Sequence, residues 1–230
     1  MVLNETIEDL QLGGLTILQK KKGFRFGVDA VLLSNFVQVK KGDVVLDIGT
    51  GTGIIPILLA AKTQARHITG LEIQEEFAEM AARSVARNAQ EKQISIIQGD
   101  IKDWESLFGK AKFDLVVSNP PYIEGMSGLK NSSDSVSIAR HEIKCTLQDV
   151  VAAAAGVLRP NGRLAMIYRP HRLVDLFEAF RANGIEPKTI RFVSANVGDV
   201  PSLVVVQGTK FGKKELKVLE NLYIGEAPNE

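Results

Sequence analysis

Apolar residues along the chain fall into short continuous runs that alternate with segments of helical period. Residues 44–48, Val-Val-Leu-Asp-Ile, are nearly all apolar, which is typical of a strand buried on both faces of a parallel sheet. Further strands are expected at 67–72, 93–98, 112–118, 162–168, 187–194 and 202–208. Helices are expected at 30–37, 54–62, 75–90, 102–109, 145–158 and 172–183. The alternation predicts an α/β fold with a doubly wound, seven-stranded sheet.

The two ends of the pattern depart from this alternation. Only a loop, 194–201, separates the last two strands, so we expect a mostly parallel sheet with an antiparallel terminal strand. Residues 1–37 are interpreted as an N-terminal extension, in which short strands precede a helix that Asp29 is expected to cap. Residues 38–230 are expected to form the main domain.

A glycine-rich turn follows the strand at 44–48, with glycines at positions 49, 51 and 53. The dinucleotide fingerprint is not complete, because Ile54 stands where its last small residue belongs, and the P-loop lysine is absent. Asp47 ends the strand directly before Gly49, Gly51 and Gly53. A carboxylate there repels a pyrophosphate and attracts a cation. S-adenosylmethionine fits better, since it carries a sulfonium and an ammonium group and no phosphate.

Two further acids end the next two strands. Glu72 can accept hydrogen bonds from both hydroxyls of a ribose. Asp100 can accept from the amino group of the cofactor's adenine, beside the backbone donor and apolar wall of Ile101. Three acids at successive strand ends line the sheet edge at which open α/β folds bind ligands. The candidate cofactor-binding set is completed by Phe26, Asp29, Ile73 and Asn119.

The strand at 112–118 ends in Asn119-Pro120-Pro121-Tyr122. Two prolines stop the strand and fix a rigid turn. The Asn119 side chain and the Pro120 carbonyl can accept hydrogen bonds from an amino group, and the Tyr122 ring can stack on a flat substrate. These three residues are the candidate catalytic groups, and the turn indicates chemistry on a planar amine or amide.

Composition and charge narrow the partners. The net charge of +1 excludes a strong overall charge for nucleic acid, so any polyanion must bind local clusters. No apolar run spans a membrane, no signal peptide is evident, and Cys145 is the only cysteine, with no metal-ligand spacing around it. We therefore expect a cytoplasmic protein without a metal; its oligomeric state is left open. Candidate RNA contacts are Lys20, Lys21, Lys22 and Arg25; Arg140 and His141; Arg169, His171 and Arg172; and Lys210, Lys213, Lys214 and Lys217.

The order of these motifs resembles the class I S-adenosylmethionine-dependent methyltransferases over about residues 24–208. Residues 47–53 look like the glycine motif of that family, and residues 119–122 look like the motif of its amino-methylating members. Residues 25–33 and 139–142 are similar to the bacterial tRNA1(Val) adenine N6-methyltransferase group. The resemblance implies a Rossmann-like fold, S-adenosylmethionine as the cofactor and a tRNA adenosine beside the anticodon as the target.

Two other functions stay open at this stage. Release-factor glutamine methyltransferases share the Asn-Pro-Pro-Tyr turn, but they carry a helical domain before the glycine motif, whereas only 46 residues precede Asp47 here. The other alternative is a non-catalytic, cofactor-binding protein that associates with RNA. An intact Asn119 and Tyr122 favour catalysis over this third function.

Overall fold

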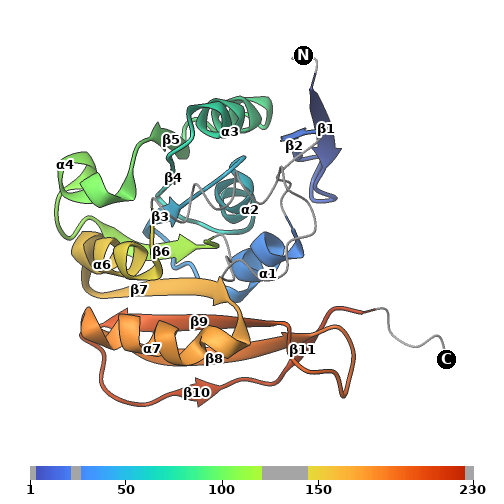
Figure 1. The fold of residues 1–230 in the computed structure, drawn as a ribbon. Helices are drawn as coiled ribbons and strands as arrows, with labels where there is room; N and C mark the ends of the chain where they lie inside the picture. Colours follow the sequence, from blue (N-terminus) through green and yellow to red (C-terminus); the bar gives the residue numbers. More distant parts are fainter. Residues whose placement is uncertain (1–3, 22–26, 121–144, 226–230) are drawn as a thin grey trace.

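One twisted sheet runs through the computed structural model, which describes residues 4–21, 27–120 and 145–225 (Figure 1). Its long strands are β3 (Val44–Ile48), β4 (His67–Glu72), β5 (Ile94–Gln98), β6 (Phe113–Ser118), β7 (Leu158–Tyr168), β8 (Ile185–Ser194) and β9 (Leu203–Lys210). They lie in the order β8-β9-β7-β6-β3-β4-β5. The neighbours from β7 to β5 are parallel, and β9 is antiparallel to both β7 and β8. The predicted mostly parallel sheet with a reversed last long strand is confirmed.

The sheet is wider than the seven strands expected. Two short strands, β10 (Lys217–Val218) and β11 (Leu222–Tyr223), pair with the outer edge of β8. The apolar pattern could not reveal them, because each has only two residues and both are exposed. They cover backbone groups that β8 would otherwise leave unpaired at the sheet edge.

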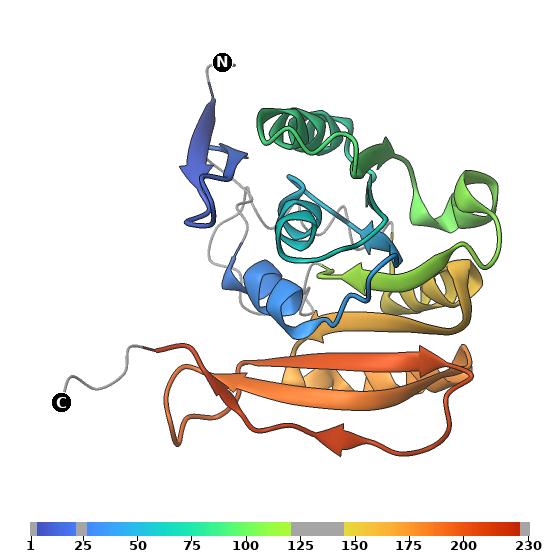
Figure 2. The same ribbon diagram turned by 180° about the vertical axis from the view of Figure 1, so that it is seen from behind.

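Helices cover both faces of the sheet (Figures 1 and 2). One face packs against α1 (Val28–Phe36), α2 (Ile54–Lys62) and α3 (Glu75–Arg87). The other packs against α4 (Trp104–Phe108), α6 (Leu147–Val157) and α7 (Leu173–Ala182). Alternate strand residues enter the two apolar clusters, as the period of a strand requires: Val45 faces the first cluster, and Leu46 and Ile48 face the second. The doubly wound arrangement is thereby confirmed.

Two helix boundaries differ from the sequence prediction. Asp29 does not cap α1, because the helix begins at Val28, two residues before the expected start, and Asp29 lies in its first turn. A carboxylate in the first turn still interacts favourably with the helix dipole. The helix expected at 102–109 is split into a 3₁₀ turn, η1 (Ile101–Asp103), and α4. A second 3₁₀ turn, η2 (Pro170–Arg172), precedes α7.

An N-terminal hairpin docks on α3. Its strands, β1 (Glu5–Asp9) and β2 (Thr16–Lys20), pair antiparallel, and Gly13 and Gly14 lie in the turn between them. Asn88 accepts a hydrogen bond from the Thr16 N–H at 2.9 Å and donates to the Thr16 carbonyl at 2.7 Å. Arg83 donates two hydrogen bonds to the Glu5 carboxylate, at 2.6 and 2.7 Å. These bonds fasten the hairpin to α3 and to Asn88 at its C-terminal end.

A buried ion pair closes the amino-terminal edge of the sheet. The guanidinium of Arg163, at the start of the regular part of β7, donates to the Asp43 carboxylate and to the Gln38 carbonyl. The Lys40 N–H also donates to Asp43, at 2.8 Å. Both side chains of the pair are about nine-tenths buried. Among the described residues, no helix is both long and apolar enough to cross a membrane.

Replacing Arg163 with alanine is expected to destabilise the protein by about 3–5 kcal/mol, because it leaves the Asp43 carboxylate buried without its partner. The free energy of unfolding in urea, measured at neutral pH, tests this. Lys110→Ala is the matched control, since the Lys110–Glu105 pair is exposed and its loss should leave the unfolding midpoint nearly unchanged. An equal effect of the two substitutions would contradict the assignment.

Candidate cofactor and substrate site

The glycine turn after β3 requires glycine at three positions. Gly49, Gly51 and Gly53 have φ values of +74°, +57° and +88°, in the left-handed region that other residues rarely adopt. A Cβ on Gly53 would also lie 3.2 Å from the Cβ of Ala81 in α3. The N–H of Gly49 donates to the carbonyl of Leu71 at 2.9 Å, which fastens the turn to the neighbouring strand. The predicted strand–turn–helix element is confirmed as a rigid, open turn.

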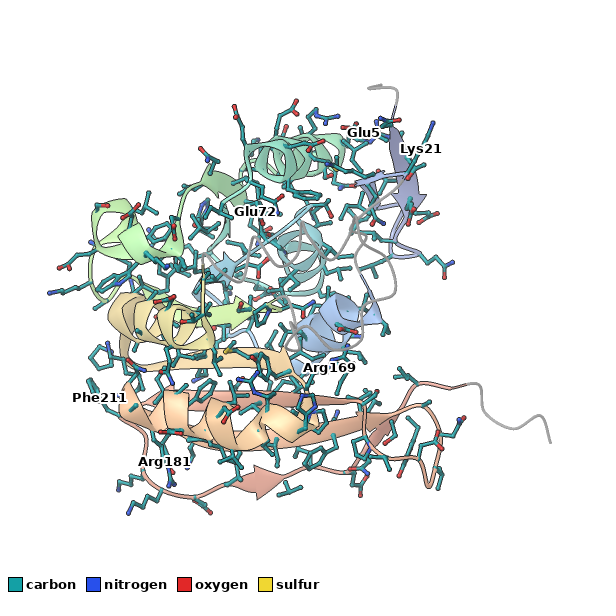
Figure 3. The ribbon with its side chains drawn as sticks, in the orientation of Figure 1. Glu5, Lys21, Glu72, Arg169, Arg181 and Phe211 are labelled. Carbon is teal, nitrogen blue, oxygen red and sulfur yellow. The ribbon has the colours of Figure 1, made fainter. Side chains whose placement is uncertain are left out.

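Glu72, at the end of β4, holds the middle of that turn. Its carboxylate accepts a hydrogen bond from the Gly51 N–H at 2.9 Å and another from the Gln74 N–H at 3.0 Å. The side chain is only 5% exposed and lies inside the molecule (Figure 3). Because both oxygens are engaged by backbone donors, the orientation of the carboxylate is fixed before any ligand binds.

Asp47 is the most unusual group at this edge. It is fully buried, and within the described part of the chain neither of its carboxylate oxygens has a hydrogen-bond partner. Burial raises the pKa of Asp47 to about 7; the nearby Thr50 hydroxyl offsets part of this rise, and the negative charge of Glu72 adds to it. A buried acid without a donor or a cation is costly, so a positively charged group placed beside Asp47 would stabilise its ionised form.

The polar groups at this edge fit the cofactor expected from the sequence. Two buried carboxylates beside an open glycine turn suit a ligand with an ammonium or sulfonium group and would oppose a phosphate. The described residues contain no group of three His, Cys, Asp or Glu side chains placed to hold a metal ion.

The third acid ends the next strand. The Asp100 carboxylate accepts from the Lys102 N–H at 2.9 Å and so begins the η1 turn. The Gly99 N–H donates to the carbonyl of Glu72 at 2.9 Å, which keeps the ends of β5 and β4 together. Ile101 is buried, and Ile73 is partly buried. The structure thus brings the three predicted acids to one edge of the sheet.

Asn119 and Pro120 follow β6, which is the strand on the other side of β3. Ser118 pairs in register with Ile48, and its hydroxyl donates to the Ile48 carbonyl at 2.9 Å. Asn119 therefore begins beside Gly49, and it is partly exposed. Asp29 is also partly buried, in the first turn of α1. Other sequence-predicted site residues lie outside the described residues: Lys22, Arg25, Phe26, Tyr122, Arg140 and His141.

Two residues that shape this edge were missed by the sequence analysis. Ser118 fixes the position of Asn119 through the Ile48 carbonyl, and a hydroxyl residue at a buried strand end was its only signal. Gly70 lies inside β4, where a Cβ would come within 2.9 Å of the Thr50 side chain. A glycine in a strand interior often marks such a close approach, so this signal was readable.

The basic clusters do not share one edge. Arg169 follows the carboxyl end of β7, on the same side as Asn119, whereas Lys210 pairs beside the amino-terminal part of β7. The Lys210 ammonium donates to the carbonyls of Ala155 and Leu158 at the end of α6. Figure 3 shows Arg169 and Phe211, the neighbour of Lys210, at opposite ends of the sheet. Lys210, one of the candidate RNA contacts, therefore lies at the opposite edge from Asn119, because β9 runs in the reverse direction.

A parallel sheet, a left-handed glycine turn and acids at three successive strand ends define the class: a doubly wound fold with the site of a nucleoside cofactor. Residues 26–181 match the family model described as the methyltransferase small domain, and the chain belongs to that family. The methyltransferase class expected from the sequence is confirmed.

Known proteins support the same assignment. A tRNA1(Val) (adenine(37)-N6)-methyltransferase of Porphyromonas gingivalis is 36% identical over 185 residues, which is 78% of this chain and 69% of the relative. A protein of the same name from Bacteroides fragilis is 28% identical over 90% of this chain and 86% of its own. The crystal structure of a predicted O-methyltransferase from Agrobacterium tumefaciens superposes with a TM-score of 0.71 at 21% identity, covering 87% of this chain and 89% of that chain. This last likeness shows the fold.

Replacing Asp47 with asparagine should change how stability depends on pH. The pKa of Asp47 is raised in the folded protein, to about 7, so its contribution to stability is fully present below about pH 4 and is lost as the pH rises toward 7. The asparagine side chain cannot ionise, and the ligand-free variant should gain about 2–4 kcal/mol relative to the wild type between about pH 4 and pH 8. Urea unfolding at several pH values measures this; Asp103→Asn, at an exposed carboxylate, is the control. Parallel pH profiles for the wild type and D47N would refute the unpaired burial of Asp47.

Proposed function

We propose that this chain is an S-adenosylmethionine-dependent methyltransferase that acts on N6 of adenosine in RNA, most specifically in a tRNA. The observation that carries the proposal is the unpaired, buried Asp47 carboxylate under the glycine turn, with the Asn119-Pro120 acceptors on the adjacent strand. The names of the relatives from Porphyromonas gingivalis and Bacteroides fragilis support adenine N6 as the acceptor and a tRNA as the substrate.

The cofactor is assigned along the carboxyl edge from β3 to β5. Asp47 attracts the positive charge of the methionine portion, and the glycine turn gives its backbone room to approach. Glu72, already oriented by the Gly51 N–H, accepts from the ribose hydroxyls. The Asp100 carboxylate accepts a hydrogen bond from the amino group of the adenine, and Ile101 forms an apolar wall beside it. Further cofactor contacts proposed from the sequence are Phe26, Asp29, Ile73 and Asn119.

Asn119 and Pro120 act on the acceptor nitrogen. S-adenosylmethionine supplies a methyl group that its sulfonium has already activated. Asn119 Oδ1 accepts one hydrogen of the adenosine N6 and the Pro120 carbonyl accepts the other, which aligns the nitrogen for attack. Positive charge develops on N6 during transfer, so these acceptors bind the transition state more strongly than the ground state. Positioning alone contributes about 7–11 kcal/mol in favourable cases. Tyr122 is proposed to stack on the target base.

RNA contacts are assigned to the basic groups at the edge that carries Asn119. Arg169 and His171 follow β7, and Lys21 directly follows the hairpin strand β2; Arg169 and Lys21 are labelled in Figure 3. Lys20 also interacts with Glu76, at 2.5 Å. Lys210 is not part of this assignment, because its ammonium binds the end of α6 at the other edge.

Asn119→Ala is expected to reduce methyl transfer at least about a hundredfold, because the lost acceptor aligns the substrate amine. Cofactor affinity should fall far less than the rate, because Asn119 is only one of several proposed cofactor contacts. Labelled S-adenosylmethionine, incubated with bulk tRNA lacking this modification, gives the rate, and nucleoside mass spectrometry identifies the product as N6-methyladenosine. Calorimetry with the cofactor gives its affinity.

Asn35→Ala is the matched control for this substitution. Asn35 is an exposed asparagine that accepts from Lys62 in α2, far from the carboxyl edge, and its loss should leave the rate unchanged. Full activity of N119A would overturn the proposed mechanism. Label that enters a release-factor glutamine and no RNA would overturn the proposed substrate.

A further inference from the structure

The loop between β8 and β9, Ala195–Ser202, presents two valines to solvent. Val197 is 80% exposed and Val200 87%, the highest fractions among the large apolar residues that the structure describes. Neither residue serves the turn, because β-branched side chains are disfavoured there and Asn196, Gly198 and Asp199 supply its chemistry. Two exposed valines together on one loop therefore call for an explanation outside the loop.

The backbone of this β8–β9 loop is held in place by its own side chains. The Asp199 carboxylate accepts from the Asn196 N–H at 2.9 Å and from the Asn196 side chain at 3.0 Å. The buried hydroxyl of Ser194 donates to the Asp199 carbonyl at 3.2 Å. The valines are thus held on a preorganised backbone, and a partner that binds them meets little cost of ordering the loop.

The segment after β11 braces the loop from outside. The Ile224 N–H donates to the Ser194 carbonyl at 3.1 Å, and the Gly225 N–H donates to the Ala195 carbonyl at 2.7 Å. A Cβ on Gly225 would lie 2.4 Å from the Asn196 side chain, so the two segments are in close contact. The short C-terminal strands therefore fix the loop as well as covering β8.

The register of the sheet places the loop at the carboxyl edge, the edge at which Asn119 lies. Ser118 is level with Met166, Met166 with Val206, and Val206 with Ile190. Ser194 is four residues beyond Ile190, so β8 continues about 13 Å past the level of Ser118. Three strand spacings, about 14 Å, separate β6 from β8. The loop therefore lies two to three strands away from β6 and extends past the level of Ser118, on the side of the molecule where β6 and β7 end (Figure 1).

A cation connects the loop with the end of β7. The Arg169 guanidinium donates to the Ser202 carbonyl at 3.1 Å, at the foot of the loop. Arg169 comes from the strand that lies between Asn119 and the loop. An apolar surface with a guanidinium at its foot suits single-stranded RNA, in which an unstacked base packs on apolar groups and its phosphate meets the cation.

We propose that the β8–β9 loop is a substrate-binding element that packs Val197 and Val200 against the base of an unpaired nucleotide near the target adenosine. Arg169 faces the phosphate of the same strand. The inference rests on the proposed function, since it takes RNA as the substrate of Asn119. The proposed contact selects a target adenosine that lies in single-stranded RNA. It takes no part in the methyl transfer, which is assigned to Asn119 and Pro120.

The double variant Val197→Ser/Val200→Ser tests this. With an anticodon stem-loop RNA as the probe, KM for RNA should rise about tenfold, while kcat, KM for S-adenosylmethionine and the melting temperature stay at wild-type values. Val197→Ile/Val200→Ile should keep KM for RNA near the wild type, because it preserves the apolar surface. Val218→Ser is the matched control: Val218 is 61% exposed on β10, level with Ile190 and away from the loop.

A photoreactive benzophenone side chain at position 197 provides the direct readout. It should cross-link to the RNA, and the same group at position 218 should not. An unchanged KM for RNA in the double variant, or a cross-link from position 197 to a second copy of the chain, overturns the inference and leaves the proposed function standing. If the wild type transfers no methyl to any RNA, the proposed function fails and this inference fails with it.

Discussion

A buried carboxylate without a partner governs the carboxyl edge of this sheet. Asp47 is carried there by β3, whose other residues are apolar and, except for the partly buried Val44, buried in the core. The fold gives it no donor among the described residues and places the Glu72 carboxylate near enough to raise its pKa further. A charge in this position is stabilised by a cation from outside, and ligand-free protein forfeits stability to keep it available. In the proposed function, the carboxylate that attracts the cofactor is thus a cost to the ligand-free fold.

The rest of the molecule offsets that cost away from the site. Two apolar clusters enclose the sheet, and the hairpin β1–β2 is fastened to α3 through Asn88 and Arg83. The opposite edge carries the paired charges of Arg163 and Asp43, where the buried carboxylate has two donors. The carboxylate at the amino edge is thus paired, whereas Asp47 at the carboxyl edge has no hydrogen-bond partner among the described residues.

The sequence predicts those parts of this arrangement that depend on a local pattern of residues. The run at β3 and the glycines after it are visible because a buried parallel strand and a left-handed turn each demand particular residues. The meeting of Asp47, Glu72 and Asp100 follows from the rule that parallel strands end at one edge. The neighbourhood of Asn119 and Gly49 does not follow, because it depends on β6 pairing with β3 across 70 residues, as Ser118 and Ile48 show. The start of α1 and the split of η1 from α4 depend on backbone bonds that no period encodes.

The reversed direction of β9 has the largest effect on the site among the features that the period of apolar residues does not predict. A parallel strand in its place would need a crossover and would begin at the amino edge. Because β9 is antiparallel, its first residue lies at the substrate edge and its last, Lys210, at the far edge. The β8–β9 hairpin therefore places Lys210 at the edge away from the site and a short loop at the edge that carries the site. With Lys210 at the far edge, the proposed recognition of RNA beside Asn119 relies on the few cations near the ends of β2 and β7 and on shape and apolar contact. That balance suits a substrate whose phosphates attract it weakly and whose unstacked bases decide where it binds.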